Sequence, residues 1–143
     1  MPNFTVFTTN QTLNEFKNYQ LATVDGAKAQ TLAAFYTEIK RELELPDYFA
    51  NNLDSLDEMI NDLEWIENEN VAIVFKNTGL LLAGEKKPNK LIDMLNLLDA
   101  TAEDWKWLDE EDGYRKKNFI VLIEHSPRIV KILEREEIAF DEI

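Results

Sequence analysis

The sequence predicts an α/β fold with a small, mainly parallel core sheet of three strands that is packed by helices. Two continuous apolar runs, residues 71–75 and 119–123, have the length and composition of strands buried on both faces. A third strand is expected over residues 19–24, which the turn pair Asp25-Gly26 follows. Segments with helical spacing separate these strands, and such alternation implies parallel pairing through right-handed crossovers.

Helical spacing of apolar residues marks four segments. Residues 31–43 repeat apolar side chains every three or four positions, and Pro46 ends this helix because proline disfavours helical geometry in the residue before it. Residues 53–63 have apolar spacings of three, four and three, with acids on the opposite side. A third helix is expected over residues 91–98. A fourth opens at Ser126, the expected N-cap, with Pro127 in the first helical position.

The two ends of the chain are predicted to be short additions to the core. The core spans about residues 19–124 of a single domain, residues 1–143, because this length suits one ordinary domain. In the N-terminal addition, residues 1–18, a strand-like run at residues 4–7 precedes Asn10, a candidate N-cap, and a short helix. In the C-terminal addition, residues 126–143, the last helix precedes a candidate edge strand at residues 138–140.

The three tryptophans have different expected environments. Trp65, just before a predicted strand, is expected in the core. Residues 100–112 contain Trp105 and Trp107 among acids, and this segment is compatible with either an extra helix or an ordered loop. Residues two positions apart on a helix point in different directions, so at least one of these two side chains should be partly exposed.

Acidic residues are concentrated in one part of the chain. The formal net charge is −13, and residues 42–75 hold ten acids without one lysine or arginine. This charge disfavours nucleic acid and anionic membranes as partners, since binding a polyanion requires clustered cations. It suits a basic protein partner, although solubility is the ordinary reason for an acidic surface. The ten residues are Glu42, Glu44, Asp47, Asp54, Asp57, Glu58, Asp62, Glu64, Glu67 and Glu69.

Composition also bears on the cellular compartment. The chain has no cysteine, which excludes disulfides and thiolate chemistry and fits a reducing cytoplasm. No apolar run reaches the length of a membrane span, and the first residues lack the pattern of a signal peptide. We therefore expect a cytoplasmic protein.

The sequence contains no convincing catalytic or metal site. Four scattered glycines cannot form a phosphate-binding loop. His125 lies just beyond the third predicted strand, where α/β proteins often place function, but no nucleophile accompanies it. Asp54 and Glu58 are four residues apart and could share a cation, yet no histidine or fixed loop spacing joins them. We therefore expect a non-enzymatic protein without cofactor or metal.

Residues 45–56 carry the most specific pattern, LPDYFANNLDSL. A Leu-Pro pair is followed by an acid, two aromatics, a small residue and then Asn-Leu-Asp at the start of a helix. Together with the amphipathic helix before it and the order strand, helix, strand after it, this pattern resembles the barstar family, the small inhibitors of barnase-type ribonucleases. The resemblance covers roughly residues 19–124 and implies a barstar-like layered fold.

The resemblance also implies which residues bind a partner. In the family, the loop and the second helix lie across the catalytic groove of the enzyme, where acids replace RNA phosphates and a tyrosine packs on the catalytic histidine. Neighbouring acids of the loop and helix extend the same surface. The expected partner-binding residues are Tyr48, Asn52, Asp54, Glu58, Asp47 and Asp57.

Three positions depart from the family pattern. Ala50 stands where glycine is usual, and Asp57 stands where the best-known member carries tryptophan. Glu58 replaces an aspartate, and its additional methylene moves the carboxylate by about 1.5 Å.

Structural roles stay open for the same residues. Asn51 or Asn52 is a candidate N-cap, and Asp54 could complete a capping box with Asn51. We expect Tyr48 to be exposed and Phe49 to be buried.

The leading functional hypothesis is an acidic, monomeric inhibitor or immunity protein that neutralises a basic bacterial ribonuclease by covering its active site. An alternative is a non-inhibitory adaptor or regulatory module that binds another basic protein or a different nuclease toxin. An acidic metal-dependent enzyme is the third and weakest hypothesis.

Overall fold

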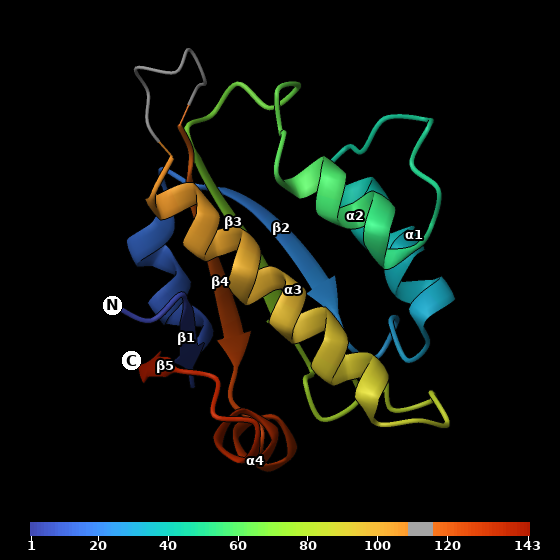
Figure 1. Cartoon of the computed structure of the whole chain (residues 1–143). Coiled ribbons are helices and arrows are strands. Elements are labelled where there is room, and N and C mark those ends of the chain that lie inside the picture. Colours follow the sequence, from blue (N-terminus) through green and yellow to red (C-terminus); the bar gives the residue numbers. More distant parts are fainter. Residues whose placement is uncertain (109–115) are drawn as a thin grey trace.

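The computed structural model describes residues 1–108 and 116–143. Its sheet contains five strands, all parallel, in the spatial order β2-β3-β4-β1-β5 (Figure 1). The strands are β1 (Phe4–Phe7), β2 (Gln20–Asp25), β3 (Asn70–Lys76), β4 (Asn118–Glu124) and β5 (Phe140–Glu142). The expectation of an α/β fold is confirmed.

The described residues also form five helices. The first, η1 (Asn10–Phe16), is a 3-10 helix. The others are α1 (Leu32–Glu42), α2 (Leu53–Ile60), α3 (Asn89–Lys106) and α4 (Pro127–Arg135). None of them combines the length and apolar character needed to cross a bilayer.

Right-handed crossovers explain how the helices are distributed over the sheet. The connections from β2 to β3, from β3 to β4 and from β4 to β5 all cross the sheet in the same direction. With right-handed crossovers, the helices in these connections, α1, α2, α3 and α4, pack on one face of the sheet. The connection from β1 to β2 runs in the opposite direction, and the same handedness places η1 on the other face. The sheet is therefore the middle layer of three.

Strand β3 shows why this sheet needs a layer on each side. Val71, Ile73 and Phe75 belong to the main core beneath the four α-helices. Ala72 and Val74 alternate with them and belong to a second apolar cluster on the η1 side. All five side chains are buried, as the continuous apolar run predicts.

The predicted strand at residues 4–7 is confirmed and an edge strand forms near the predicted residues 138–140, but the expectation of only three core strands is wrong, because both terminal strands join the same sheet. Strand β1 pairs with β4 on one side, Phe4 lying opposite Val121, and with β5 on the other, Phe4 lying opposite Phe140. The two terminal strands have four and three residues, and strands so short and so distant in sequence give no local signal of their pairing. The ends of the chain thus complete the sheet.

The prediction for the third helix is also wrong in length. Helix α3 continues from Asn89 to Lys106, because Thr101, Ala102 and Trp105 extend its buried stripe through the acidic segment. Trp105 is buried and its Nε1–H donates to the carbonyl of Ile60 at 2.9 Å. Trp107 is 81% exposed, which confirms that at least one of the pair faces solvent. Residues 109–112 of this segment lie outside the described residues.

Two further details differ from expectation. Asn10 is the first residue of η1 rather than its cap, and the preceding Thr9 makes no side-chain capping bond. Helix α2 ends at Ile60, three residues before the predicted Leu63, which has a positive φ of 54°. Trp65 is partly buried at the edge of the core, where its Nε1–H donates to the carbonyl of Leu43 at 2.9 Å.

The predicted cap of the last helix is confirmed. The Ser126 hydroxyl accepts a hydrogen bond from the Ile129 N–H at 3.1 Å, and Pro127 occupies the first helical turn. Helix α1 begins in the same way, since the Thr31 hydroxyl accepts from the Ala34 N–H at 3.2 Å.

The Phe4→Ala substitution tests whether β1 belongs to the core. Phe4 is fully buried, and we expect its truncation to lower the free energy of unfolding by about 3–5 kcal/mol. The exposed Lys131→Ala on α4 is the control, with an expected change below about 0.5 kcal/mol. Urea unfolding monitored by circular dichroism measures both, and equal midpoints for the two variants would contradict the core position of β1.

Candidate protein-binding site

The loop between α1 and α2 starts with a helix termination that needs no glycine. Glu44 adopts a left-handed conformation with φ of 53°, and its N–H donates to the carbonyl of Arg41. The next N–H, of Leu45, reaches back to the carbonyl of Lys40 at 2.9 Å. These two bonds are the Schellman arrangement, which satisfies the last carbonyls of a helix. Pro46 then prevents further helix, as predicted.

Two apolar side chains hold this loop to the core. Leu45 and Phe49 are each 5% exposed. The Phe49 ring meets the Tyr36 ring of α1 edge to face, with centroids 5.9 Å apart. Burial, and to a smaller extent the charge of Glu85, raise the pKa of Tyr36 above its ordinary value. The loop backbone therefore rests on a fixed aromatic contact.

Tyr48 points away from this anchor and is 71% exposed. The expectation of one outward and one inward aromatic is confirmed. The Phe49 N–H closes a turn onto the carbonyl of Pro46 at 3.0 Å, so adjacent side chains leave the loop on different sides. An exposed tyrosine on a pinned loop is the kind of rigid aromatic that protein interfaces favour.

Helix α2 begins with two linked hydrogen bonds between side chains and backbone. Asn52 is the N-cap, and its Oδ1 accepts from the Ser55 N–H at 2.7 Å. The Ser55 hydroxyl oxygen in turn accepts from the Ala50 N–H at 3.0 Å. Of the two candidate caps, Asn52 is confirmed. The alternative of a capping box between Asn51 and Asp54 is wrong, because the cap lies one residue later and its partner is a serine. The spacing Asn-x-x-Ser was the signal in the sequence.

Alanine at the usual glycine position causes no backbone strain. Ala50 has no positive φ, and the left-handed residue of this turn is Asn51, with φ of 55°. Asparagine tolerates this conformation better than most residues. The asparagine pair thus divides two tasks, since Asn51 makes the turn and Asn52 caps the helix.

Because the apolar side of α2 faces the core, its acidic residues face solvent. Leu56 and Ile60 are fully buried in the main core. Asp54, Asp57 and Glu58 lie on the other side and are exposed. Asp54 also lies in the first turn, where the helix dipole favours a negative charge.

A hydrogen-bond network not predicted from the sequence orients one of these acids. The Asn61 amide nitrogen donates to the Asp57 carbonyl at 2.8 Å and to Asp57 Oδ1 at 2.9 Å. It also lies 3.5 Å from the hydroxyl oxygen of Thr101 on α3. Asp57 is therefore turned toward the C-terminal end of α2, where that helix packs on α3.

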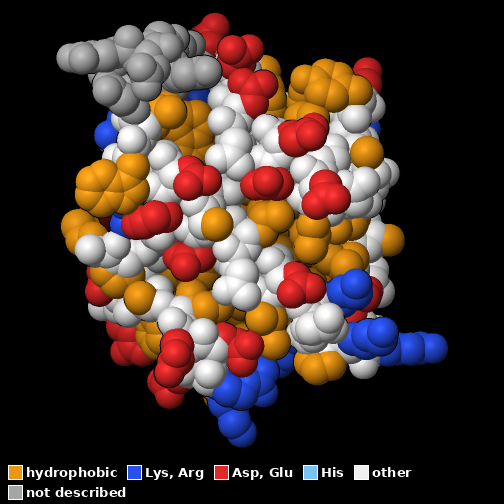
Figure 2. Space-filling model, viewed as in Figure 1, with side chains coloured by type: hydrophobic (Ala, Val, Ile, Leu, Met, Phe, Trp, Pro, Cys, Tyr) orange, Lys and Arg blue, Asp and Glu red, His pale blue; other side chains and the backbone are white. Residues whose placement is uncertain are grey.

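Within the described residues, no acid of α2 forms an ion pair. Across the described residues the ion pairs join Arg41 to Glu38 and Glu42, and Arg135 to Glu136. None involves an acid of α2. Figure 2 shows acidic side chains spread over the face formed by α2 and α3, whereas the basic side chains lie around its margin, most of them at the lower edge. The negative field of this face is thus not cancelled locally.

The six predicted residues fall on two adjoining elements. Asp47 and Tyr48 lie in the loop, and Asn52 caps the helix that carries the remaining three acids. All six are exposed, and Figure 1 shows the loop leading into the N-terminus of α2. Asn52 has its side-chain oxygen engaged in the cap. The other five present their side chains outward from a backbone that is pinned beneath them.

A model of the Barstar (barnase inhibitor) family matches residues 19–124. The chain belongs to the barstar family. The resemblance seen in residues 45–56 is thereby confirmed, and the matched region contains both the loop and α2. Barstar-family members are inhibitor proteins rather than enzymes, which confirms the expectation of a non-enzymatic protein.

Solved structures extend the likeness in fold beyond the family region. The ADP form of the Aeropyrum pernix ORC2 protein has a TM-score of 0.57 at 13% identity, covering 100% of this chain and 42% of that chain. Its ADPNP-ADP complexes give a TM-score of 0.54 at 15% identity, covering 99% and 41%. The chain thus spans about two fifths of those proteins, and at such identities the likeness concerns the fold alone. No curated protein matches the chain.

The Asn52→Ala substitution tests the cap beneath the site. We expect a loss of about 1 kcal/mol in the free energy of unfolding, because the Ser55 N–H loses its acceptor. Asn52→Ser supplies another good capping oxygen and should retain most of the stability. Chemical unfolding of both variants is the measurement. If serine and alanine destabilise the protein equally, the side-chain cap does not hold the start of α2.

Proposed function

We propose that this barstar-family protein inhibits a basic, barnase-type ribonuclease by laying the Tyr48 loop and α2 across the active-site groove of the enzyme. The observation that carries the proposal is the combination of an exposed tyrosine and three exposed α2 acids that form no ion pair in the part of the chain that the structure describes, inside the region that matches the family. Inhibition here is occlusion, with no chemistry by the inhibitor itself.

The electrostatics support a groove lined by cations. A groove that binds RNA phosphates presents arginine and lysine side chains, and carboxylates placed there form short charge-assisted hydrogen bonds. Asp54 and Glu58 lie one turn apart on the exposed side of α2. They supply two negative charges at a spacing that neighbouring phosphate subsites can accept.

The acids also act before contact. An uncompensated negative face accelerates encounter with a positive cleft, an effect for which barnase and barstar are themselves the standard example. The acids favour complex formation in a second way. Their like charges repel one another on α2, and a cationic partner that covers them relieves this repulsion.

Tyr48 supplies the apolar part of the contact. Its ring is large and has few rotatable bonds, so burying it against the enzyme loses little conformational entropy. The anchor through Phe49 fixes the loop in advance, which lowers the entropy lost on binding. Asp47, the neighbouring residue in the loop, and Asn52, at the start of α2, complete the proposed surface.

The fold likeness to the ORC2 structures does not extend the proposal to nucleotides. A phosphate-binding turn after a parallel strand uses glycines to bring backbone N–H groups close to the phosphate. The turn after β1, which η1 follows, contains no glycine, since residues 8–10 read Thr-Thr-Asn. We therefore assign no nucleotide to this chain.

Cleavage of a fluorogenic RNA by a panel of barnase-type ribonucleases tests the function. We expect inhibition at equimolar protein by the parent chain. The variant Asp54→Asn/Glu58→Gln should bind at least about 2 kcal/mol more weakly, roughly 30-fold in the inhibition constant, because the enzyme's cations lose their partners.

The control is Glu134→Gln/Asp141→Asn, which removes the same two charges from exposed positions on α4 and β5. It should inhibit as the parent does. Parent protein that binds a cationic nuclease without slowing RNA cleavage would favour the adaptor hypothesis and exclude occlusion.

Association kinetics distinguish the electrostatic acceleration of encounter from the contacts made in the docked complex. We expect the association rate constant of the parent to fall steeply between low and physiological salt, because exposed charges are screened over about 10 Å at 0.1 M. Asp54→Asn/Glu58→Gln should flatten this dependence. Tyr48→Ala should leave it unchanged and raise the dissociation rate, since the ring acts only after docking. Surface plasmon resonance over a salt series is the measurement, and a steeper salt dependence for Tyr48→Ala would contradict these separate roles.

A further inference from the structure

The C-terminal end of α2 is fixed against α3. The Nε1–H of Trp105 on α3 donates to the carbonyl of Ile60, the last residue of α2, at 2.9 Å, and this bond is buried. The amide nitrogen of the next residue, Asn61, lies 3.5 Å from the hydroxyl oxygen of Thr101 on α3. The backbone that carries Asn61 is therefore held in place by the neighbouring helix.

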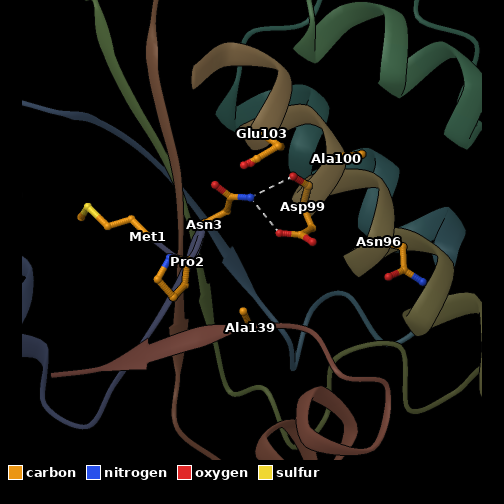
Figure 3. Close-up of a pocket in the computed structure, with 8 residues that line it drawn as sticks. All are labelled: Met1, Pro2, Asn3, Asn96, Asp99, Ala100, Glu103 and Ala139. Carbon is orange, nitrogen blue, oxygen red and sulfur yellow. Dashed lines mark hydrogen bonds between the residues drawn. The ribbon is translucent and has the colours of Figure 1, made fainter. Parts of the chain in front are cut away.

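Helix α3 is itself fixed from another side. Figure 3 shows Asn3 beside Asp99, and the Asn3 amide nitrogen donates to the Asp99 carbonyl at 3.2 Å and to Asp99 Oδ1 at 2.9 Å. Asp99 and Thr101 are two residues apart, so about 200° of helical rotation separates this contact from the one to α2. Helix α3 is thus tied to the N-terminal segment on one side and supports α2 on the other.

Asn61 connects this support to an acid of the proposed inhibitory surface. Its amide nitrogen donates to the Asp57 carbonyl at 2.8 Å and to Asp57 Oδ1 at 2.9 Å. Exchanging the amide oxygen and nitrogen would set an oxygen against both acceptors, so the observed orientation is strongly preferred. A hydrogen bond to an ionised carboxylate is stronger than a neutral one, and a side-chain amide and an aspartate one turn apart stabilise a helix. The Asp57 side chain is therefore restrained although it is exposed.

The restraint separates the carboxylate of Asp57 from the other two acids of α2. With about 100° of rotation per residue, Asp57 and Glu58 lie on opposite sides of Asp54, at about 60° and 40° from it. Helix side chains ordinarily lean toward the N-terminus, whereas the bond to Asn61 draws the Asp57 carboxylate toward the junction with α3. Within the described residues, Oδ2 of Asp57 accepts no hydrogen bond and forms no ion pair. One carboxylate oxygen is thus held and the other is free.

We propose that Asn61 is a positioning residue of the inhibitory surface, which holds the Asp57 carboxylate at the junction of α2 and α3 for a further cation of the ribonuclease. This inference rests on the proposed function. Asp54 and Glu58 meet cations of the phosphate subsites, and Oδ2 of Asp57 accepts from a lysine or arginine side chain beside them. Because the carboxylate is oriented before contact, docking loses less side-chain entropy than it would with a freely rotating aspartate. Asn61 acts through Asp57 and not by contact with the enzyme.

The rotamer of Asp57 in the free protein tests the first part of the proposal. Three-bond couplings of its β-protons, measured by NMR on the labelled full chain, report the χ1 angle. We expect one dominant rotamer in the parent and averaged couplings in Asn61→Ala, because the alanine side chain has no donor. Asn96→Ala removes an exposed asparagine of α3 next to the N-terminal segment and should leave the couplings unchanged. Averaged couplings in the parent overturn the proposal.

A double-mutant cycle on inhibition tests the second part. The probe is the barnase-type ribonuclease that the parent inhibits most tightly, and the readout is the inhibition constant. Asn61→Ala should raise this constant about threefold to tenfold, the loss expected when one side chain must be ordered on docking. In the Asp57→Ala background the same substitution should change it less than about twofold. A purely structural effect of Asn61 on α2 would weaken inhibition by the same factor in both backgrounds, and that result overturns the proposal.

A second variant, Asn61→Asp, distinguishes orientation from charge. It removes the amide donor and adds a negative charge one turn from Asp57. If Asn61 positions Asp57, this variant should associate with the ribonuclease at least as fast as the parent and dissociate about threefold to tenfold faster. Slower dissociation than that of the parent would mean that only the total negative charge matters, and it overturns the proposal.

The outcomes separate this inference from the proposed function. A parent that inhibits no ribonuclease of the panel contradicts the proposed function and, with it, the role of Asn61. A parent that inhibits a ribonuclease, with equal effects of Asn61→Ala in both backgrounds, contradicts only the role of Asn61 and leaves the occluding surface in place.

Discussion

The burial of β3 and β4 on both faces is the constraint from which the rest of this structure follows. A parallel strand with no polar face needs an apolar layer above and below it. Four α-helices cover one side of the sheet, and η1 with its neighbouring aromatics covers the other. Each of these helices must turn its apolar stripe inward. Their charged residues are left on the outside, so the distribution of charge on the surface is a consequence of how the core is built.

Helix α2 shows how that constraint produces a binding surface. It has eight residues, too few to be stable alone, and its stability comes from the burial of Leu56 and Ile60 and from the Asn52 cap. Repulsion among its exposed acids acts against folding. The burial of the core residues and the Asn52 cap offset that repulsion. The acids are therefore held close together, and a cationic partner would relieve the repulsion among them. Rigidity beneath the site and uncompensated charge above it are therefore linked.

The segments outside the family match contribute more than sheet edges. Strand β1 closes the gap between β4 and β5, and the residue just before it, Asn3, reaches Asp99 on α3. That contact joins the N-terminal segment to the helix that also supports α2 through Thr101 and Asn61. The two sides of α3 thus contact different parts of the chain. One side supports the proposed inhibitory face through Thr101, and the other holds the N-terminal segment through Asp99.

Local physical rules explain what the sequence by itself determined. The inward stripes of α1 and α2, the cap at Ser126 and the two-sided burial of β3 all follow from periodicity and from residues whose hydrogen bonds are local. The outward Tyr48 and inward Phe49 could also be predicted, because their loop pattern is specific to a family. The six residues of the proposed surface lie within 12 consecutive positions, 47–58, so their proximity needed no tertiary information.

Tertiary structure alone decided the features that join distant parts of the chain. The pairing of β1 with β4 and β5 depends on which strand edges are free once the central strands have associated, and short strands do not encode that choice. The extension of α3 past its acids became clear only where Trp105 meets the carbonyl of Ile60. The contact of the N-terminal segment with α3 was beyond sequence reasoning for the same reason. Asn3 and Asp99 are 96 residues apart, and each is an ordinary polar residue until the fold brings them together.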